Sequence, residues 1–585
     1  IWLSLLLPLE PLLQRMPFLP ITAGEGNRLI PGIAEVLQAG EESLDGVQEL
    51  TALSGGGGYK LLDGGESSQK LVEALEKAGA KFKAANARLE GVRKDTAFFE
   101  LLGRKPQLKQ YKDTVTELVN TMTELTDMGS AAPELAREFL GMEQPRTYLV
   151  MPQNTYEIRA TGGFISAAWL ITMDRGKITN LVFHDSPAVD DLTREYPPPP
   201  VAMFKYMQAG LWLFRDANWY ADFPTTAKVA SSLYFLGQRV KVDGVIAIDD
   251  LFVREVVTIL EPIPLESFQE TVTKENVVRI LENGLADLQS TSTELAPRKL
   301  LLKVLFEKLL EKTRSGLDSK QAGQLLFAFY KGLKEKHMLL YVESPSAASL
   351  LAERNWDGAL RPAPGDFLLV VDDNMGYDKV NHRIRQSLEY DVSWQEGNYG
   401  KGKLKISYKN TSSVQVSECV QQARPGAYTT FTEGCYWDFL RVYAAEGSSL
   451  EQSTYIPLPR GSLLSRLAKQ EDPNYPSKEV RERNKTVIGQ FFVVPVGEEK
   501  VLEFTFKLAP GSLSTTEGGA SYSLLVQKQP GTVGHPLVLR VHAPPGMHIR
   551  SATPEAFQVT PDVVEFRREL TEDTSFQVFF GKNRP

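Results

Sequence analysis

Residues 148–164 read YLVMPQNTYEIRATGGF, a stretch typical of a binding site at the end of a buried strand. An apolar strand leads into a polar segment, and a second apolar segment begins at Phe164. The side chains of interest between them are Glu157, Arg159, Thr161, Gly162 and Gly163. In α/β proteins, polar groups at strand ends commonly form binding sites. The glycines allow close approach of a backbone or a ligand, and Arg159 offers a fork of donors to an anion.

The sequence around this stretch alternates predicted strands and helices from residue 147 to about residue 373. The predicted strands cover 164–172, 178–183, 242–248, 338–342 and 367–371. The predicted helices cover 224–236, 275–288, 297–314 and 320–336. An alternation of this kind indicates an α/β core.

Both flanks of this core have a different pattern. Residues 28–142 carry apolar side chains at helical spacing, such as Val72, Ala78 and Phe82, which predicts a helical bundle. From about residue 385 the pattern changes to short alternating strands with Pro and Gly between them, which predicts one or two antiparallel β-sandwich domains. The predicted fold class is therefore multidomain α+β. Its expected parts are residues 1–25 (an apolar segment), 26–145 (helical), 146–380 (α/β) and 381–585 (β-sandwich).

Length and charge restrict the class of protein. The chain has 585 residues, which is too long for one domain. A formal net charge of −8 disfavours nucleic acid as a partner, because nucleic-acid binders usually carry a basic face.

Residues 1–13 (IWLSLLLPLEPLL) are apolar but too short and too interrupted to cross a bilayer. The expectation is membrane attachment through a segment at or before the N-terminus; the alternative is a buried N-terminal arm.

The two cysteines, Cys419 and Cys435, are near neighbours in sequence. A bridge between them closes a loop of about 15 residues, worth about 3 kcal/mol in the chain-entropy model. Such a bridge indicates an oxidising compartment. The alternative is two unrelated thiols.

Motifs for several common chemistries are missing. The glycines after Ser54 lack the Gly-Lys-Ser/Thr of a P-loop, and no dinucleotide fingerprint follows a strand. The six histidines are scattered without the spacing of zinc ligands.

Three polar clusters remain at the ends of predicted elements, in residues 157–163, 215–224 and 372–385. As a site, they supply Arg159, Arg215 and Arg385 for an anion, and Glu157, Asp216 and Asp222 as catalytic or cation-binding carboxylates. The candidate cofactor is a divalent cation, Mg²⁺ or Ca²⁺. In the alternative interpretation, Arg159 pairs with Asp216 or Asp222 in an internal clasp.

Several ordered motifs carry a family resemblance. They are YLVMPQNTYEIRATGGFI, RDANWYADFPT, VDGVIAID, NWDGALRP and DDNMGYDKVNHRIRQSLEYDV. Over roughly residues 146–441 the chain resembles the bacterial family called domain of unknown function 4012. The resemblance implies a membrane-anchored, extracytoplasmic protein with a helical N-terminal part, and it implies no particular activity.

The core is also similar to that of LytR-CpsA-Psr enzymes, which transfer glycopolymers from a polyprenyl-phosphate carrier to the cell wall. Arg159 matches an arginine of that family. Thr161 and Gly162 stand where its magnesium-binding Asp is expected, and His184 and Asp185 stand where it has an Arg-Asp pair. These departures disfavour metal-dependent transfer.

The sequence therefore predicts an extracytoplasmic cell-envelope protein that binds an anionic component at Arg159, such as a lipid-linked glycan phosphate. The alternative is a non-catalytic structural or assembly protein of the cell surface, with other surface proteins as partners. Catalysis and oligomeric state stay open.

Overall fold

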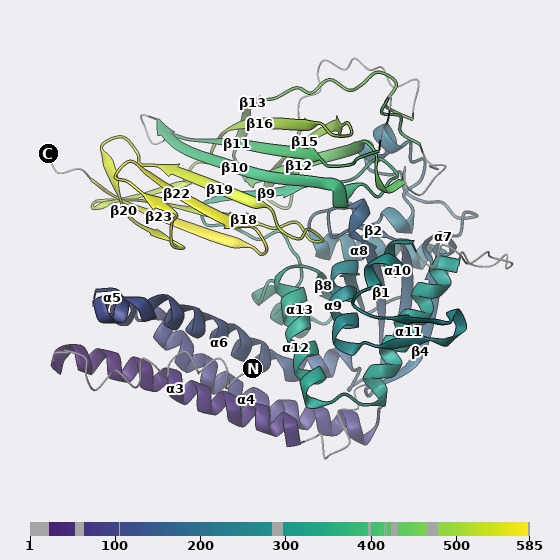
Figure 1. The fold of residues 1–585 in the computed structure, drawn as a ribbon, viewed down its shortest axis with the longest axis horizontal. Coiled ribbons are helices and arrows are strands. Elements are labelled where there is room, and N and C mark those ends of the chain that lie inside the picture. The colour runs from purple at the N-terminus through teal and green to yellow at the C-terminus, as the bar shows by residue number, and fades with distance from the viewer. Residues whose placement is uncertain are drawn as a thin grey trace.

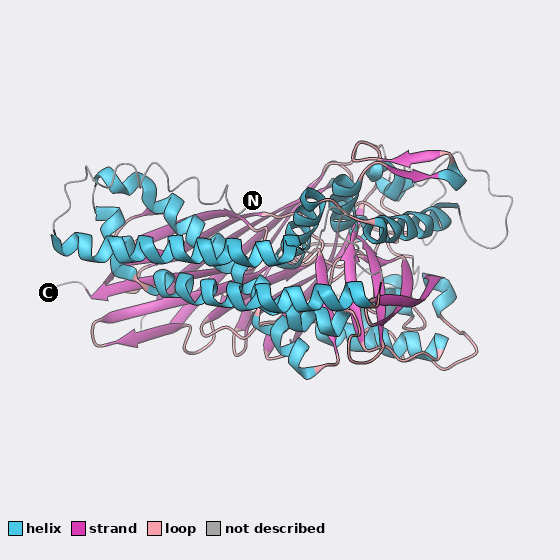
Figure 2. Ribbon diagram, turned by 90° about the horizontal axis from the view of Figure 1, so that it is seen from below, coloured by secondary structure: helices cyan, strands magenta, loops and turns pink. Residues whose placement is uncertain are grey.

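The computed structural model describes residues 23–52, 64–104, 106–283, 297–395, 399–414, 416, 418–422, 431–464 and 478–582. It has a helical unit (23–139), an α/β unit (146–353) and a two-sheet unit (366–582). Figure 1 shows the helical and two-sheet units extending in the same direction from the α/β unit. From below, the long helices run along the sheets (Figure 2). The predicted N-terminal segment 1–25 lies outside the described residues, except that 23–25 begin the first helix.

The helical unit confirms the prediction of N-terminal helices. Its members are α3 (Ala23–Thr51), α4 (Glu66–Lys94), α5 (Thr96–Arg104) and α6 (Pro106–Phe139). Apolar side chains at helical spacing, including Leu89, Leu118 and Met122, form its core. No helix among the described residues has the length and the hydropathy needed to cross a membrane.

The α/β unit is built on a mixed sheet with the strand order β4-β3-β1-β5-β8, and β2 pairs with β1. The strands are β1 (Arg146–Asn154), β2 (Phe164–Ile165), β3 (Ala167–Asp174), β4 (Lys177–Asp185), β5 (Gly244–Asp249) and β8 (Met338–Val342), and β6 (Ile263–Leu265) and β7 (Glu270–Val272) form a separate pair. The helices are α7 (Ser186–Val189), α8 (Phe223–Gln238), α9 (Asp250–Leu260), α10 (Val277–Asn283), α11 (Pro297–Ser315), α12 (Ser319–Lys334) and α13 (Pro345–Glu353).

The central strand β1 is buried on both faces because successive side chains point to opposite sides. Leu149 and Met151 pack in a cluster with α8, whereas Tyr148 and Val150 pack in a cluster with α9, α12 and α13. The C-terminal end of α6 covers part of this second face, so the helical unit is joined directly to the sheet.

The two-sheet unit confirms the prediction of a strand-rich C-terminal region. One sheet has the order β13-β16-β11-β10-β19-β22-β21, and the other β14-β15-β12-β9-β18-β23-β20, with β17 paired to β18. The strands are β9 (Asp366–Val371), β10 (Ile384–Gln395), β11 (Tyr399–Asn410), β12 (Tyr436–Ala445), β13 (Ser449–Ser453), β14 (Lys478–Glu482), β15 (Lys485–Val494), β16 (Glu499–Lys507), β17 (Leu513–Thr516), β18 (Gly519–Gln527), β19 (Pro536–His542), β20 (Met547–Thr553), β21 (Gln558–Val559), β22 (Val563–Glu569) and β23 (Thr574–Lys582). Both sheets contribute side chains to one shared core.

Two details differ from the sequence-based expectation. Strand β9 was expected in the α/β core, but it pairs with β12 and β18 in the two-sheet unit. An apolar run such as FLLVV suits the centre of either sheet, so its sequence does not choose between them. The strands are also not all antiparallel, because β10 pairs with β19, and β9 with β18, in parallel.

Strands β12 and β15 are buried along their whole length. One face of β12, with Tyr436 and Leu440, points into the shared core. The other face, with Trp437 and Phe439, packs on the short π-helix Met203–Met207 of the α/β unit, which carries Tyr206. The two units therefore share an extensive apolar contact.

Candidate functional site

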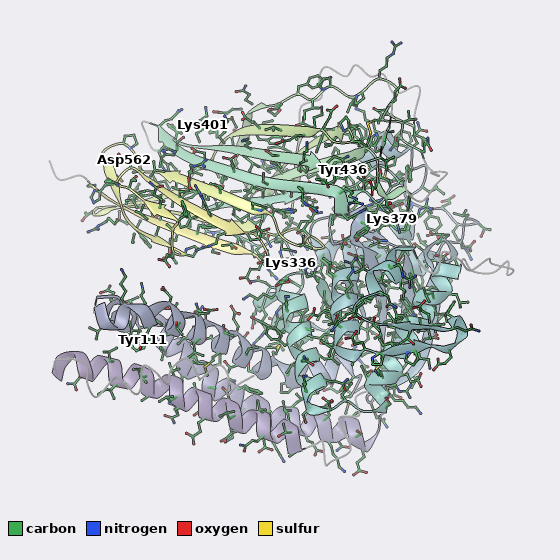
Figure 3. The ribbon with its side chains drawn as sticks, viewed as in Figure 1. Tyr111, Lys336, Lys379, Lys401, Tyr436 and Asp562 are labelled. Atoms are coloured by element: carbon green, nitrogen blue, oxygen red, sulfur yellow. A yellow bond between two sulfur atoms is a disulfide. The ribbon has the colours of Figure 1, made fainter. Side chains whose placement is uncertain are left out.

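All three polar clusters predicted from the sequence take part in one junction between the α/β unit and the two-sheet unit. The cluster after β1 and the cluster after β9 are joined through their main chains. The amide of Asn374 donates to the carbonyl of Ile158 over 3.0 Å, and the amide of Ala160 donates to the Asp373 carboxylate over 3.1 Å. Figure 3 shows Lys379, in the cluster after β9, at the end of the two-sheet unit that meets the α/β unit.

Arg159 lies inside this junction, with only 3 % of its surface exposed. One guanidinium nitrogen donates to Glu157 over 2.9 Å, and another donates to the carbonyls of Asn374 (2.5 Å) and Ile158 (3.2 Å). Asp216 lies 3.8 Å away. Burial disfavours the charge of Arg159, but the surrounding carboxylates outweigh this effect and raise its pKa. The guanidinium is therefore charged and held by protein atoms.

Gly162 and Gly163 permit close approach of backbone, as the sequence suggested. A Cβ on Gly531 of the two-sheet unit would lie 2.0 Å from the carbonyl oxygen of Gly162, and a Cβ on Gly163 would lie 2.2 Å from that of Asn154. Gly162 has φ +135°, a conformation that favours glycine. Gly163 and Gly531 thus accommodate neighbouring main chain, whereas Gly162 leaves room for the Gln153 side chain, whose Oε1 would lie 2.0 Å from a Cβ there.

Arg441 and Asp373 form a second buried ion pair, which sequence analysis missed. Two guanidinium nitrogens donate to one Asp373 oxygen over 2.7 and 3.1 Å, and one of them also donates to the carbonyl of Trp219 over 2.6 Å. The guanidinium stacks 4.4 Å from the Trp219 ring centre. The sequence signal that could have revealed this ion pair is the charged Arg441 inside the largely apolar strand YWDFLRVYAA.

The second cluster also faces the two-sheet unit. Asp222 caps α8 by accepting from the amide of Thr225, and it accepts from Arg483 in the β14–β15 turn over 2.9 Å. The amide of Ala221 donates to Glu482 over 3.1 Å. Asp222 therefore pairs with Arg483, and not with Arg159.

The three candidate arginines differ in their surroundings. Arg215 is partly exposed and lies 3.4 Å from Asp216. Arg385 is exposed and donates to the carbonyls of His382 and Ile384. Of the three, only Arg159 is enclosed in the junction.

The third cluster adds buried carboxyl groups, but it does not resemble a cation site. In the described residues, no group of three or more His, Cys, Asp or Glu side chains is arranged to hold a metal ion. Asp372 accepts from Tyr408 over 2.6 Å, and Asp378 accepts from Asn374 over 2.9 Å. These carboxylates bind hydrogen-bond donors of the protein.

Cys419 and Cys435 form a disulfide, as the sequence suggested. Both sulfurs lie in the apolar cluster that also contains Met203, Tyr206 and Phe439. The bridge therefore supports the surface on which the α/β unit packs.

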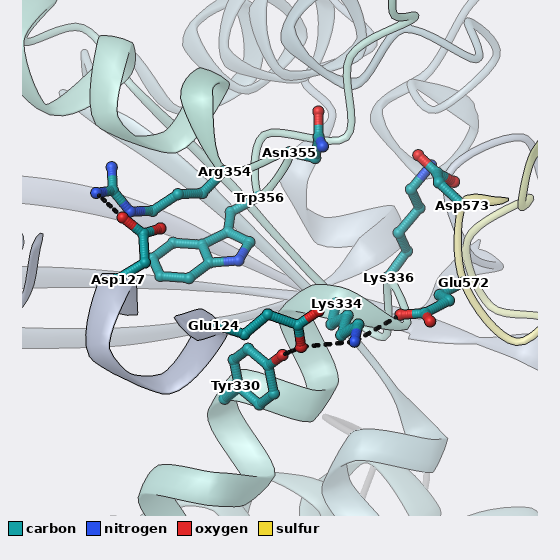
Figure 4. Close-up of a pocket in the computed structure, with 10 residues that line it drawn as sticks. All are labelled: Glu124, Asp127, Tyr330, Lys334, Lys336, Arg354, Asn355, Trp356, Glu572 and Asp573. Atoms are coloured by element: carbon teal, nitrogen blue, oxygen red, sulfur yellow. Dashed lines mark hydrogen bonds and ion pairs between the residues drawn. The ribbon is translucent and has the colours of Figure 1, made fainter. Parts of the chain in front are cut away.

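A cavity of about 200 Å³ lies where all three units meet (Figure 4). Its charged side chains are paired with one another. Lys334 of α12 joins Glu124 of the helical unit (2.8 Å) to Glu572 of the two-sheet unit (3.0 Å). Lys336 pairs with Asp573 over 2.6 Å. These ion pairs connect the three units, and they occupy Lys334 and Lys336, the two lysines that could otherwise bind an anion.

Comparison with curated proteins found no match. A comparison with family models found one, described as "Protein of unknown function (DUF4012)", over residues 143–285. The matched segment is shorter than the 146–441 expected from the motifs, and it starts just before β1 and includes the first two polar clusters. The LytR-CpsA-Psr resemblance stays a prediction. Residues 143–285 of this chain are therefore similar to the DUF4012 family.

Proposed function

We propose that this chain is a non-catalytic structural or assembly protein of the bacterial cell surface, in which the polar stretch after β1 fastens two units together. The burial of Arg159 between Glu157 and the Asn374 carbonyl carries this proposal. A phosphate-binding arginine must offer donors to its ligand. The donors of Arg159 are directed at protein atoms on both sides of the junction.

The disulfide supports an extracytoplasmic location. Cytosolic thiols are kept reduced, and stable disulfides belong mostly to secreted and surface proteins. The Cys419–Cys435 bridge lies under the contact between the units, so its formation is part of the folded architecture.

The proposal is tested with the purified full chain. Arg159→Met is compared with Arg385→Met, which removes an exposed arginine of the third polar cluster, residues 372–385. We expect Arg159→Met to lower the melting temperature clearly and Arg385→Met to leave it nearly unchanged. Inorganic pyrophosphate with Mg²⁺ is expected to shift neither the wild type nor the variants.

An opposite result would support anion binding. It would be a rise in melting temperature with pyrophosphate and Mg²⁺ that Arg385→Met retains and Arg159→Met loses. Location is tested separately, by protease treatment of intact cells. Degradation of the chain while a cytosolic marker survives is expected, and protection of both would contradict a surface location.

A further inference from the structure

The junction encloses more acids than bases. Its buried carboxyl groups come from the segment after β1, the loop after β9 and strand β12, and they are Glu157, Asp372, Asp373, Asp378 and Asp438. The cations that face them are Arg159, Arg441 and Lys379, which are equally buried. Asp216, paired with the more exposed Arg215, borders the group on the α/β side. Isolated buried charges are costly, so an excess of carboxylates favours proton binding.

Asp372 and Asp438 are the first pair of carboxyl groups that would share such a proton. The two carboxyl groups act on each other: a hydrogen bond with the Asp438 side chain lowers the pKa of Asp372, and the charge of Asp372 raises the pKa of Asp438. Tyr408 donates to Asp372, and Tyr436 donates to Asp438 over 2.9 Å. The second oxygen of Asp438 accepts from no donor among the described residues, and Asp438 has no exposed surface. Two ionised carboxylates that are buried side by side repel each other, whereas one shared proton allows a hydrogen bond between them.

Asp378 is the second candidate. One of its oxygens accepts from Asn374 Nδ2 and from the amide of Val380, and the other is buried without a donor among the described residues. Burial is the main cause that raises the pKa of Asp378 to about 7, and the nearby Glu157 contributes to this rise. Burial likewise raises the pKa of Asp372 to about 7.

We infer that these carboxyl groups hold protons in the folded protein and thereby make the contact between the α/β unit and the two-sheet unit pH-dependent. Asp373 and Asn374, which hydrogen-bond to Ala160 and Ile158 across the junction, sit between the two proton sites in sequence. Loss of the protons places uncompensated charge beside those bonds. The junction therefore weakens as the pH rises. The coupling is a property of the junction and needs no assumption about compartment or partner.

The direction of the effect follows from linkage. An unfolded Asp loses its proton near pH 4, whereas these groups keep theirs to about pH 7. Between these limits the folded state binds more protons, so stability falls as the pH rises. The unfolding equilibrium constant is expected to rise by up to about tenfold per pH unit for each proton released.

The test uses the full chain as wild type, Asp378→Asn, Asp438→Asn and Asp562→Asn. Asn imitates a protonated Asp, and Asp562 is an exposed acid at the opposite end of the two-sheet unit (Figure 3). The denaturant midpoint is measured from pH 5.5 to 8.5. We expect the midpoint of the wild type and Asp562→Asn to fall with pH. The fall should be smaller in Asp378→Asn and in Asp438→Asn.

Two readouts locate the effect. Amide exchange in residues 158–163 and 372–381 should accelerate at high pH more than intrinsic exchange does, while β18 in the core stays protected. Infrared spectra of the wild type should contain a buried protonated-carboxyl band at pH 6 that is lost by pH 8.5. Parallel pH profiles of wild type and Asp378→Asn, or an absence of that band at pH 6, would overturn the inference even if Asp438→Asn does not fold.

Discussion

Gly531 lies directly against Gly162, so that a Cβ on Gly531 would be 2.0 Å from the carbonyl oxygen and 2.7 Å from the Cα of Gly162. Gly531 also has φ +80°. Gly531→Ala is therefore expected to be destabilising for two reasons, left-handed backbone strain and a clash with main chain. Thermal or denaturant unfolding of the purified chain measures the loss.

Gly546→Ala separates these two reasons. Gly546 has φ +76°, and a Cβ there would meet nothing within 4 Å. Gly546→Ala should lower the unfolding free energy only by the cost of left-handed backbone strain, about 1–2 kcal/mol. Gly531→Ala should lose about 1–3 kcal/mol more, the usual cost of overpacking. Equal losses would show that the two backbones separate easily and that the junction is loose.

The ion pair between Arg441 and Asp373 predicts a large single-residue effect. Arg441→Met leaves the Asp373 carboxylate buried without its partner, and we expect a loss of about 3–5 kcal/mol in unfolding free energy. Asp373→Asn combined with Arg441→Met should cost less than the sum of the single changes, because no unpaired charge remains. Denaturant unfolding of all four proteins measures this coupling.

Lys405→Ala is the control for that prediction. Lys405 pairs with Glu389 over 2.8 Å on the outer face of the first sheet, and both side chains are more than a third exposed. Exposed pairs contribute about 0–1 kcal/mol. A loss at Arg441 no larger than the loss at Lys405 would argue that water reaches the junction.

Asp222 caps α8, accepts from Arg483 and accepts from the amide of Leu360 over 3.1 Å, so its removal should cost more than the removal of Arg483. Asp222→Ala deletes the cap of α8 and the acceptor of Arg483, whereas Arg483→Ala deletes only a half-exposed donor. Loss of a cap alone costs about 1 kcal/mol. We expect Asp222→Ala to lower the unfolding free energy by about 2 kcal/mol and Arg483→Ala by less than 1 kcal/mol. The reverse order in denaturant unfolding would contradict the capping role.

Local patterns predicted the elements well because they depend on neighbours in sequence. In β10, alternate residues from Gln386 to Trp394 are buried, as the period of a strand requires. Pro224 lies in the first turn of α8, next to its cap Asp222. The polar stretch after β1 was likewise identified as a place of close approach, with Arg159 expected to offer donors to an anion.

The partners of that stretch were not predictable in the same way. Gln529 donates to the carbonyl of Arg159 from 370 positions away, and Arg441 reaches Trp219 from 222 positions away. No local periodicity records such distances. A polar segment at a strand end has the same sequence pattern whether a ligand or a second unit occupies it, so the choice between site and clasp required the three-dimensional contacts.

The disulfide predicts a redox dependence of the junction. Cys419 and Cys435 share an apolar cluster with Met203 and Tyr206, and Tyr206 stacks on Phe491 at 3.9 Å between ring centres. Reduction removes a loop constraint worth about 3 kcal/mol and loosens the surface under residues 203–207. We expect a lower melting temperature with a reducing agent and faster proteolysis within residues 203–207.

Cys419→Ser combined with Cys435→Ser should lower the melting temperature by the same amount without reductant, and reductant should lower it no further. Titration of the chain produced in an oxidising compartment and then denatured should find no free thiol before reduction and two afterwards; two free thiols before reduction would contradict the bridge.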